Sequence, residues 1–130
     1  MIKQDYIIRM IQEIISAIAE SILKRRKLEI RDRNEYDNIA RQVLGMNFSE
    51  LSTTDSKEII DRYSGNDEGT EKLEFIAVSM LMMSEEEDKD LLLKSRLKQS
   101  GAELLKHVQQ NSHDYSLQRE ALIRMINMNG

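Results

Sequence analysis

The chain has 130 residues, of which 40% are hydrophobic and 32% charged, and its formal net charge is −4. It contains no Pro, no Cys and only five Gly, which excludes disulfides, thiolate metal sites and cysteine nucleophiles. This length and composition are typical of one globular domain over residues 1–130, and the lack of helix-breaking residues predicts an all-α fold. The mild negative charge does not favour nucleic acid as a partner.

The first predicted helix lies within residues 3–30 and is unusually apolar. One face carries, at helical spacing, Ile7, Ile11, Ile14, Ile18 and Ile22. A second row of apolar residues widens this face to more than half of the helix circumference. Such a helix is expected to be mostly buried, either in its own core or against a second copy of the chain. The region has no uncharged run close to the ~20 residues of a membrane span, so we expect a cytoplasmic protein without a transmembrane segment.

Four adjacent cations follow the apolar stripe; they are Lys24, Arg25, Arg26 and Lys27, called the basic cluster below. Such a cluster can bind phosphates or an anionic membrane surface. Cations near a helix C-terminus are also common because they interact favourably with the helix dipole, and neighbouring acidic residues can neutralise them. The sequence leaves two endings for this helix, which either continues past the cluster into solvent or breaks near residues 32–34.

Five further helices are predicted, over residues 34–44, 55–63, 70–85, 88–110 and 117–128. Gly45 is placed to end the first of these in the left-handed conformation. In the connection that follows, Phe48 and Leu51 are expected to hold the loop against the core. Asp55 and Glu58 have the spacing of a capping box.

The C-terminal half is predicted to be a helix pair followed by one more helix. The pair spans residues 70–110, a length similar to a tetratricopeptide repeat, and the acidic segment Glu85–Asp90 marks the turn between its helices. Ser116 is a good N-cap for the last helix. We therefore expect an array of five to six helices with a tetratricopeptide-like superhelical arrangement in this half, although the repeat's own pattern of small and aromatic residues is not matched.

No constellation of residues points to catalysis. The two histidines, His107 and His113, are too far apart for a metal pair on one helix, and no motif fixes a nucleophile beside either. Adjacent acids in Glu85–Asp90 point in different directions on a helix and lack the glycine of a calcium loop. The sequence therefore predicts no catalytic residue, no cofactor-binding residue and no metal ligand, and we expect the protein not to be an enzyme. An enzyme built from His113 and scattered acids is the alternative.

Three segments carry a family resemblance; they are Ile2–Ile14 (IKQDYIIRMIQEI), Leu91–Val108 (LLLKSRLKQSGAELLKHV) and Tyr115–Ile126 (YSLQREALIRMI). Together they resemble a family of small bacterial proteins that is catalogued as a domain of unknown function. The resemblance implies an all-helical domain similar in shape to tetratricopeptide-type helix pairs. It implies no activity and no site residues.

The sequence leads to two hypotheses for function. The first is a non-enzymatic protein–protein interaction module that binds a protein partner or forms a homo-oligomer through the first helix. The second is an anionic-surface binding protein, for nucleic acid or a membrane, that uses the basic cluster. The candidate interaction surface of both hypotheses together consists of Ile7, Ile11, Ile14, Ile18, Lys24, Arg25, Arg26 and Lys27.

Overall fold

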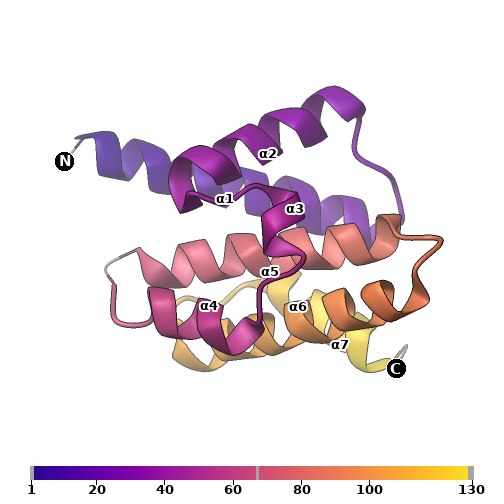
Figure 1. Cartoon of the computed structure of the whole chain (residues 1–130). Helices are drawn as coiled ribbons and strands as arrows, with labels where there is room; N and C mark the ends of the chain where they lie inside the picture. The colour runs from indigo at the N-terminus through magenta and orange to yellow at the C-terminus, as the bar shows by residue number, and fades with distance from the viewer. Residues whose placement is uncertain (1, 67, 129–130) are drawn as a thin grey trace.

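The structure, a computed structural model, describes residues 2–66 and 68–128, and over these ranges it consists of seven α-helices and no strand. The helices are α1 (Ile2–Leu23), α2 (Ile30–Leu44), α3 (Phe48–Leu51), α4 (Ser56–Tyr63), α5 (Gly69–Glu86), α6 (Leu91–Asn111) and α7 (Leu117–Met128) (Figure 1). The all-α prediction is confirmed. The structure has one helix more than expected, the single turn α3, which lies in the predicted loop.

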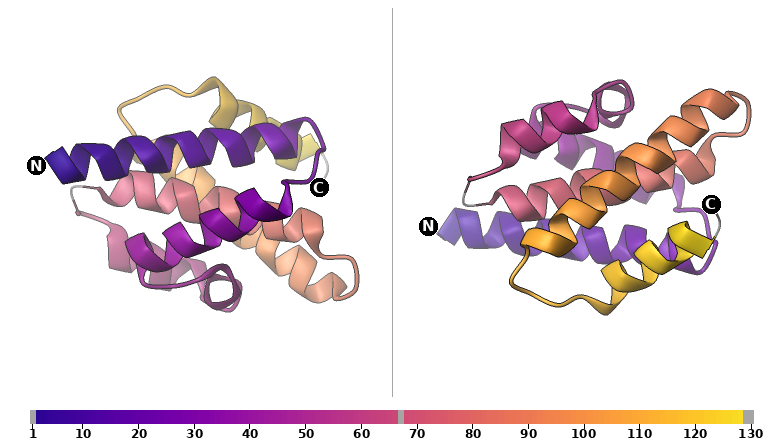
Figure 2. Two further views of the ribbon diagram at one scale, coloured as in Figure 1. Left: turned by 90° about the horizontal axis from the view of Figure 1, so that it is seen from above. Right: turned by 90° about the horizontal axis from the view of Figure 1, so that it is seen from below.

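Helix α5 is the centre of the molecule. Every residue from Phe75 to Ser84 is buried, which follows from a run of ten residues without a charge between Glu74 and Glu85. A helix that is apolar all round has to be covered on all sides. Helices α1, α3, α4 and α6 pack against it. The view from above has α1 and α2 nearest the viewer, and the view from below has α6 and α7 nearest (Figure 2).

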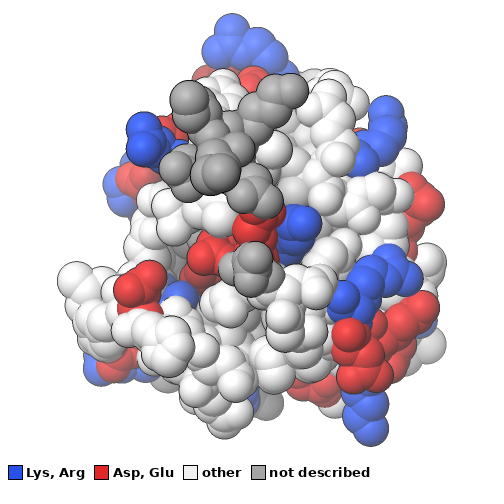
Figure 3. Space-filling view, turned by 90° about the vertical axis from the view of Figure 1, so that its left-hand side faces the viewer, with Lys and Arg blue, Asp and Glu red and all other residues white. Residues whose placement is uncertain are grey.

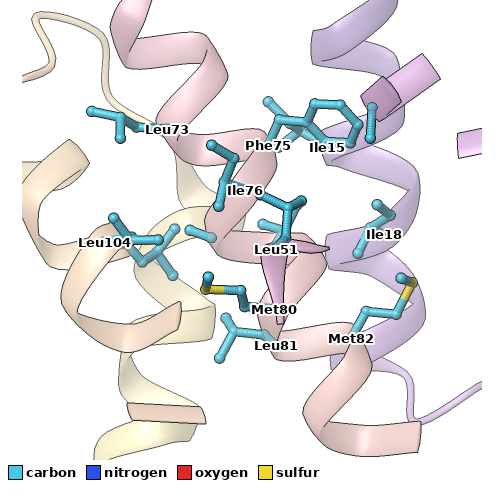
Figure 4. Packing of buried hydrophobic residues seen from close by; sticks show 14 of the residues in the cluster. Ile15, Ile18, Leu51, Leu73, Phe75, Ile76, Met80, Leu81, Met82 and Leu104 are labelled. Atoms are coloured by element: carbon cyan, nitrogen blue, oxygen red, sulfur yellow. The ribbon is translucent and has the colours of Figure 1, made fainter. Parts of the chain in front are cut away.

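The two faces of α5 serve two different neighbours. Phe75 and Met82 point toward α1, where Ile15 and Ile18 lie (Figure 4). Leu73, Ile76, Met80 and Leu81 lie on the side of Leu104 of α6 (Figure 4). The methionines at 80, 82 and 83 are all buried, so they fill this core, which has few aromatic residues.

Helix α2 is attached to the rest of the molecule by few buried side chains and by polar contacts. Its buried side chains are Ile39, Ala40 and Leu44. Near its start, Arg33 Nε donates to both carboxylate oxygens of Glu86 at 3.0 Å, and the guanidinium lies 5.4 Å from the ring centroid of Phe48. Further along, Asp37 Oδ1 accepts a hydrogen bond of 2.7 Å from the backbone N–H of Phe48. These polar contacts connect α2 to α5 and α3 where few apolar side chains do so.

Helices α5 and α6 form an antiparallel pair with a very close approach at Gly101. A Cβ at this position would lie 2.9 Å from Leu81 Cγ and 3.1 Å from the carbonyl oxygen of Ala77. Glycine therefore sets the distance between the two helices. Helix α4 closes the pair from the outside, and Ser56 Oγ donates to Glu103 Oε2 at 2.7 Å.

Helix α7 is held by a buried arginine. The side chain of Arg119 is 4% exposed, and its guanidinium donates to Gln109 Oε1 at 2.6 Å, to Glu74 Oε2 at 3.1 Å and to the carbonyl oxygen of Asp114 at 2.6 Å. Burial raises the pKa of Glu74, and the positive charge of Arg119 opposes that rise. The cluster joins α7 to α5, to α6 and to the loop before it, with Leu122 as the one buried apolar side chain of α7.

A tetratricopeptide-like superhelix is not shown by the structure. In such an arrangement each helix stacks on the ones before it and the array stays open. Here α7 turns back and packs against α1 as well as α6. The apolar stripe of α1 explains the difference, because its wide face needs cover from more than one helix.

One predicted helix cap is wrong and two are confirmed. The capping box predicted at Asp55 and Glu58 is absent, since the Asp55 side chain makes no capping hydrogen bond. A capping box is present instead at Asn47 and Glu50, at the start of α3. By contrast, Gly45 ends α2 with φ of 75°, and Ser116 Oγ accepts from the backbone N–H of Arg119, both as predicted.

Candidate interaction surface

The isoleucine stripe of α1 is inside the molecule. Ile11, Ile14 and Ile18 are buried, and Ile7 is partly buried and packed against the same core. The expectation that this face is a surface for a second copy is therefore corrected. The second apolar row explains why, since α1 uses both rows within its own chain, packing against α5 and α7.

The basic cluster lies at the end of α1, where the helix stops at Leu23. Neither predicted ending is correct, because the chain leaves the helix within the cluster and α2 begins at Ile30. The backbone N–H of Arg26 donates to the carbonyl oxygen of Ser21, and that of Arg25 donates to Ile22, which is the hydrogen-bond pattern of a Schellman motif. The left-handed position of this motif is Arg25, with φ of 53°. The motif turns the next residues away from the axis of α1.

Only the first cation of the cluster has an ionic partner among the described residues. Lys24 Nζ lies 2.5 Å from Glu20 Oε1, one turn earlier on α1, and this contact lowers the pKa of Glu20. Arg25, Arg26 and Lys27, called the cation triplet below, are exposed. None of the three forms an ion pair with a carboxylate in the part of the chain that the structure describes.

A cleft of about 210 Å³, called the end cleft below, separates the cation triplet from the C-terminal end of α5. Its apolar lining consists of Ile22, Leu28 and Met82. The cation triplet lines the cleft, and so do Glu85 and Glu86. Glu86 pairs with Arg33. The carboxylate of Glu85 makes no hydrogen bond or ion pair with a described residue. The cleft can thus receive an apolar side chain next to an acidic group.

The acidic segment Glu85–Asp90, called the acidic corner below, lies at the same end of the molecule. The turn between α1 and α2 and the turn between α5 and α6 are both on the right in Figure 1. Within the corner, Glu87 Oε2 accepts from the backbone N–H groups of Lys89 and Asp90, and Asp90 Oδ1 caps α6 at Leu93. The side chains of Glu87 and Asp90 therefore stabilise the turn between α5 and α6.

The remaining acidic side chains of the corner face solvent. Glu85 and Asp88 are exposed and take part in no hydrogen bond or ion pair with the residues described. Two leucines follow directly at the start of α6: Leu91 is 70% exposed and Leu92 is 86% exposed. The periodicity of α6 turns Leu93 and Leu97 toward the core and leaves these two outside. The corner therefore presents acidic and apolar groups side by side.

The opposite end of the molecule holds a polar hollow at His107. Its volume is about 330 Å³, and its polar lining includes Ser64, Asn66, Thr70 and Asn111. Among the described residues, neither an acidic residue nor His113 is in that lining. Figure 3 shows this end, where much of the surface is uncharged and Lys and Arg lie mainly toward the rim.

Comparisons with known proteins do not assign the chain to a family. No family model, no curated protein and no solved structure matches the chain. The resemblance to small bacterial proteins therefore remains an expectation, of which the structure confirms only the all-helical character. None of the described helices is long and apolar enough to cross a membrane. Among the described residues, no three His, Asp or Glu side chains converge as metal ligands do.

Sequence reasoning located half of this surface. The basic cluster was visible as four adjacent cations after an apolar stripe. The sequence also has the signal for the exposed leucines, which was not used: Leu93, Leu97 and Leu104 share the face toward the core. Leu91 and Leu92 fall outside the helical spacing of that face.

Proposed function

We propose that this protein is a non-enzymatic helical interaction protein that binds an acidic segment of a protein partner in the end cleft. One observation carries the proposal. The cation triplet is exposed and without ionic partners among the described residues, and it stands beside a cleft with an apolar lining. Charges arranged in this way steer a partner of opposite charge, and the apolar lining retains a side chain once it arrives.

A protein segment fits this end better than a nucleic acid or a membrane does. Phosphate backbones and anionic bilayers favour a broad surface of one charge. Glu85 and Glu86 line the same cleft as the cation triplet, and Asp88 and Asp90 are exposed nearby. These carboxylates repel an extended polyanion but leave room for a segment that places single acidic groups against the triplet. Anionic-surface binding through the basic cluster is the alternative.

A comparison of three immobilised proteins tests the proposal. The first is the unmodified chain, and the second is the cleft variant, with Arg25→Gln, Arg26→Gln and Lys27→Gln. The third is a control with the same change in charge, Arg41→Gln, Lys57→Gln and Lys106→Gln; these cations are exposed, line neither the end cleft nor its rim, and make no ion pair with a described residue.

Each immobilised protein is exposed to an extract of the source cell. We expect the unmodified chain and the control to retain a protein from this extract that the cleft variant does not retain. Retention by all three proteins, or by none, contradicts the proposal. The same three proteins are tested at low salt with duplex DNA and with acidic phospholipid vesicles. One outcome favours the anionic-surface alternative instead: none of the three proteins retains a protein from the cell, and only the cleft variant fails to bind DNA or vesicles.

A further inference from the structure

We infer that the acidic segment recognised by the end cleft is the acidic corner of a second copy of this chain, so that two copies associate end to end. This inference rests on the proposed function and names its partner. Its basis is that one end of the molecule carries both halves of a complementary contact, namely the cation triplet with the end cleft and the acidic corner with Leu91 and Leu92.

The charges on the two halves are available for a second copy. The cation triplet has no ionic partner among the described residues, and the exposed carboxylates of Glu85 and Asp88 have none either. Several other charged groups of this end are engaged within one copy, whereas the exposed side chains of Glu29 and Lys89 form no ion pair with a described residue. Lys24 pairs with Glu20, Arg33 with Glu86, and Lys94 Nζ donates to the carbonyl oxygen of Ser84 at 2.7 Å. Among the exposed groups without an ionic partner, cations prevail around the triplet despite Glu29, and carboxylates prevail in the acidic corner despite Lys89. The two turns are neighbours and carry opposite charge.

The apolar groups match in the same way. The end cleft is lined by Ile22, Leu28 and Met82 and has a volume of about 210 Å³, which is large enough for a leucine side chain. Leu91 and Leu92 are exposed directly after the acidic corner, so an acidic group of one copy reaches the triplet while a leucine enters the cleft. Burial of an exposed leucine supplies the attraction that salt does not screen.

Twofold symmetry follows from the position of both halves at one end. When the corner of one copy meets the cleft of its partner, rotation by 180° places the partner's corner against the first copy's cleft. Each contact is then made twice, which is the property of an isologous interface and the commonest route to a closed dimer. A head-to-tail chain would need the two halves at opposite ends.

Charge reversal tests the pairing. One variant carries Arg26→Glu and Lys27→Glu, and the other carries Glu85→Lys and Asp88→Lys. All four side chains are exposed and make no hydrogen bond or ion pair with a described residue, so both variants should fold. By sedimentation equilibrium, each variant alone is expected to dimerise at least about tenfold more weakly than the unmodified chain.

An equimolar mixture of the two variants gives the decisive result. In the mixed pair the reversed triplet of one variant meets the reversed corner of the other, and the second contact keeps its natural charges. The mixture is therefore expected to recover a dimer within about threefold of the affinity of the unmodified chain. The control Lys57→Glu with Lys106→Glu, which changes the charge equally outside this end, is expected to dimerise normally. A further variant, Leu91→Ser with Leu92→Ser, is expected to weaken the dimer without altering the helical circular dichroism spectrum.

An unmodified chain that stays monomeric up to about 200 µM overturns the inference, and so does a dimer that neither reversal weakens. Failure here is distinguishable from failure of the proposed function. A monomer that still retains a different protein through the cation triplet keeps the proposed function and removes only the second copy as the partner.

Discussion

Arg25 holds a backbone conformation that glycine adopts more easily. Its φ of 53° lies in the left-handed region, where an L side chain places its Cβ close to the following carbonyl oxygen. The Schellman hydrogen bonds at the end of α1 fix this conformation. Arginine at this strained position places a guanidinium in the lining of the end cleft. Glycine would relieve the strain but would supply no charge.

Replacement Arg25→Gly is expected to stabilise the fold and weaken binding. The free energy of unfolding should rise by about 0.5–1 kcal/mol, because relief of left-handed strain exceeds the extra entropy of glycine in the unfolded chain. Urea denaturation followed by circular dichroism measures this change. Arg26→Gly is the control, since Arg26 has no positive φ and should gain nothing. A loss of stability in Arg25→Gly would contradict the assignment of strain.

Arg119 is a residue of structure rather than of binding. Its guanidinium is buried with Glu74 and accounts for most of the polar contact that α7 makes with α5 and α6. Burial raises the pKa of Glu74 despite the nearby positive charge, because water solvates this carboxylate poorly. Removal of the Arg119 guanidinium would leave the Glu74 carboxylate without its ionic partner.

Replacement Arg119→Met should therefore destabilise the protein by roughly 3–5 kcal/mol, the usual cost of breaking one side of a buried ion pair. Thermal and urea unfolding measure the effect. Arg124→Met is the matched control on the same helix, because Arg124 is exposed and, among the described residues, pairs only with Glu120 one turn away. Equal effects of the two replacements would contradict the role given to Arg119.

At the scale of elements, the α5–α6 pair depends on the absence of a side chain at Gly101. Alanine has the higher helix propensity, by about 1 kcal/mol, so an open site would gain stability from Gly101→Ala. Here the added Cβ would lie 2.9 Å from Leu81 Cγ and 3.1 Å from the Ala77 carbonyl oxygen. We expect a net loss of about 1–3 kcal/mol from overpacking.

A double-mutant cycle checks the cause of that loss. Leu81→Ala removes the atom that the new Cβ meets, at its own cost of a cavity in the core. The double variant with Gly101→Ala should lose less stability than the sum of the two single variants, by about 0.5–1 kcal/mol or more. Strict additivity in urea denaturation would show that the two side chains do not compete for this space.

Much of this element structure could be predicted from periodicity and caps. The bounds of α7 and the cap at Gly45 follow from local residues, as does the burial of Phe48 and Leu51 in the connection after α2. The end of α1 and the start of α2 could not be predicted, because arginine in the left-handed position gives no local signal of a helix end. The capping box at Asn47 likewise depends on a turn that only tertiary packing makes helical.

At the scale of the whole molecule, burial decides which predicted site residues can act. Of the candidate surface, Ile11, Ile14 and Ile18 belong to the core, and the basic cluster remains at the surface. The apolar excess of α1 could be seen in the sequence, but what covers it could not. That depends on α5 and on the return of α7, two contacts far apart along the chain.

Amide hydrogen exchange at two protein concentrations tests most directly whether the end of the molecule, and not the face of α1, makes the contact between copies. Exchange is measured by mass spectrometry at about 1 µM and about 200 µM. We predict that protection increases with concentration in segments 24–30 and 85–93 and stays constant in segment 7–18. Protection that increases only in segment 7–18, or nowhere, would contradict it.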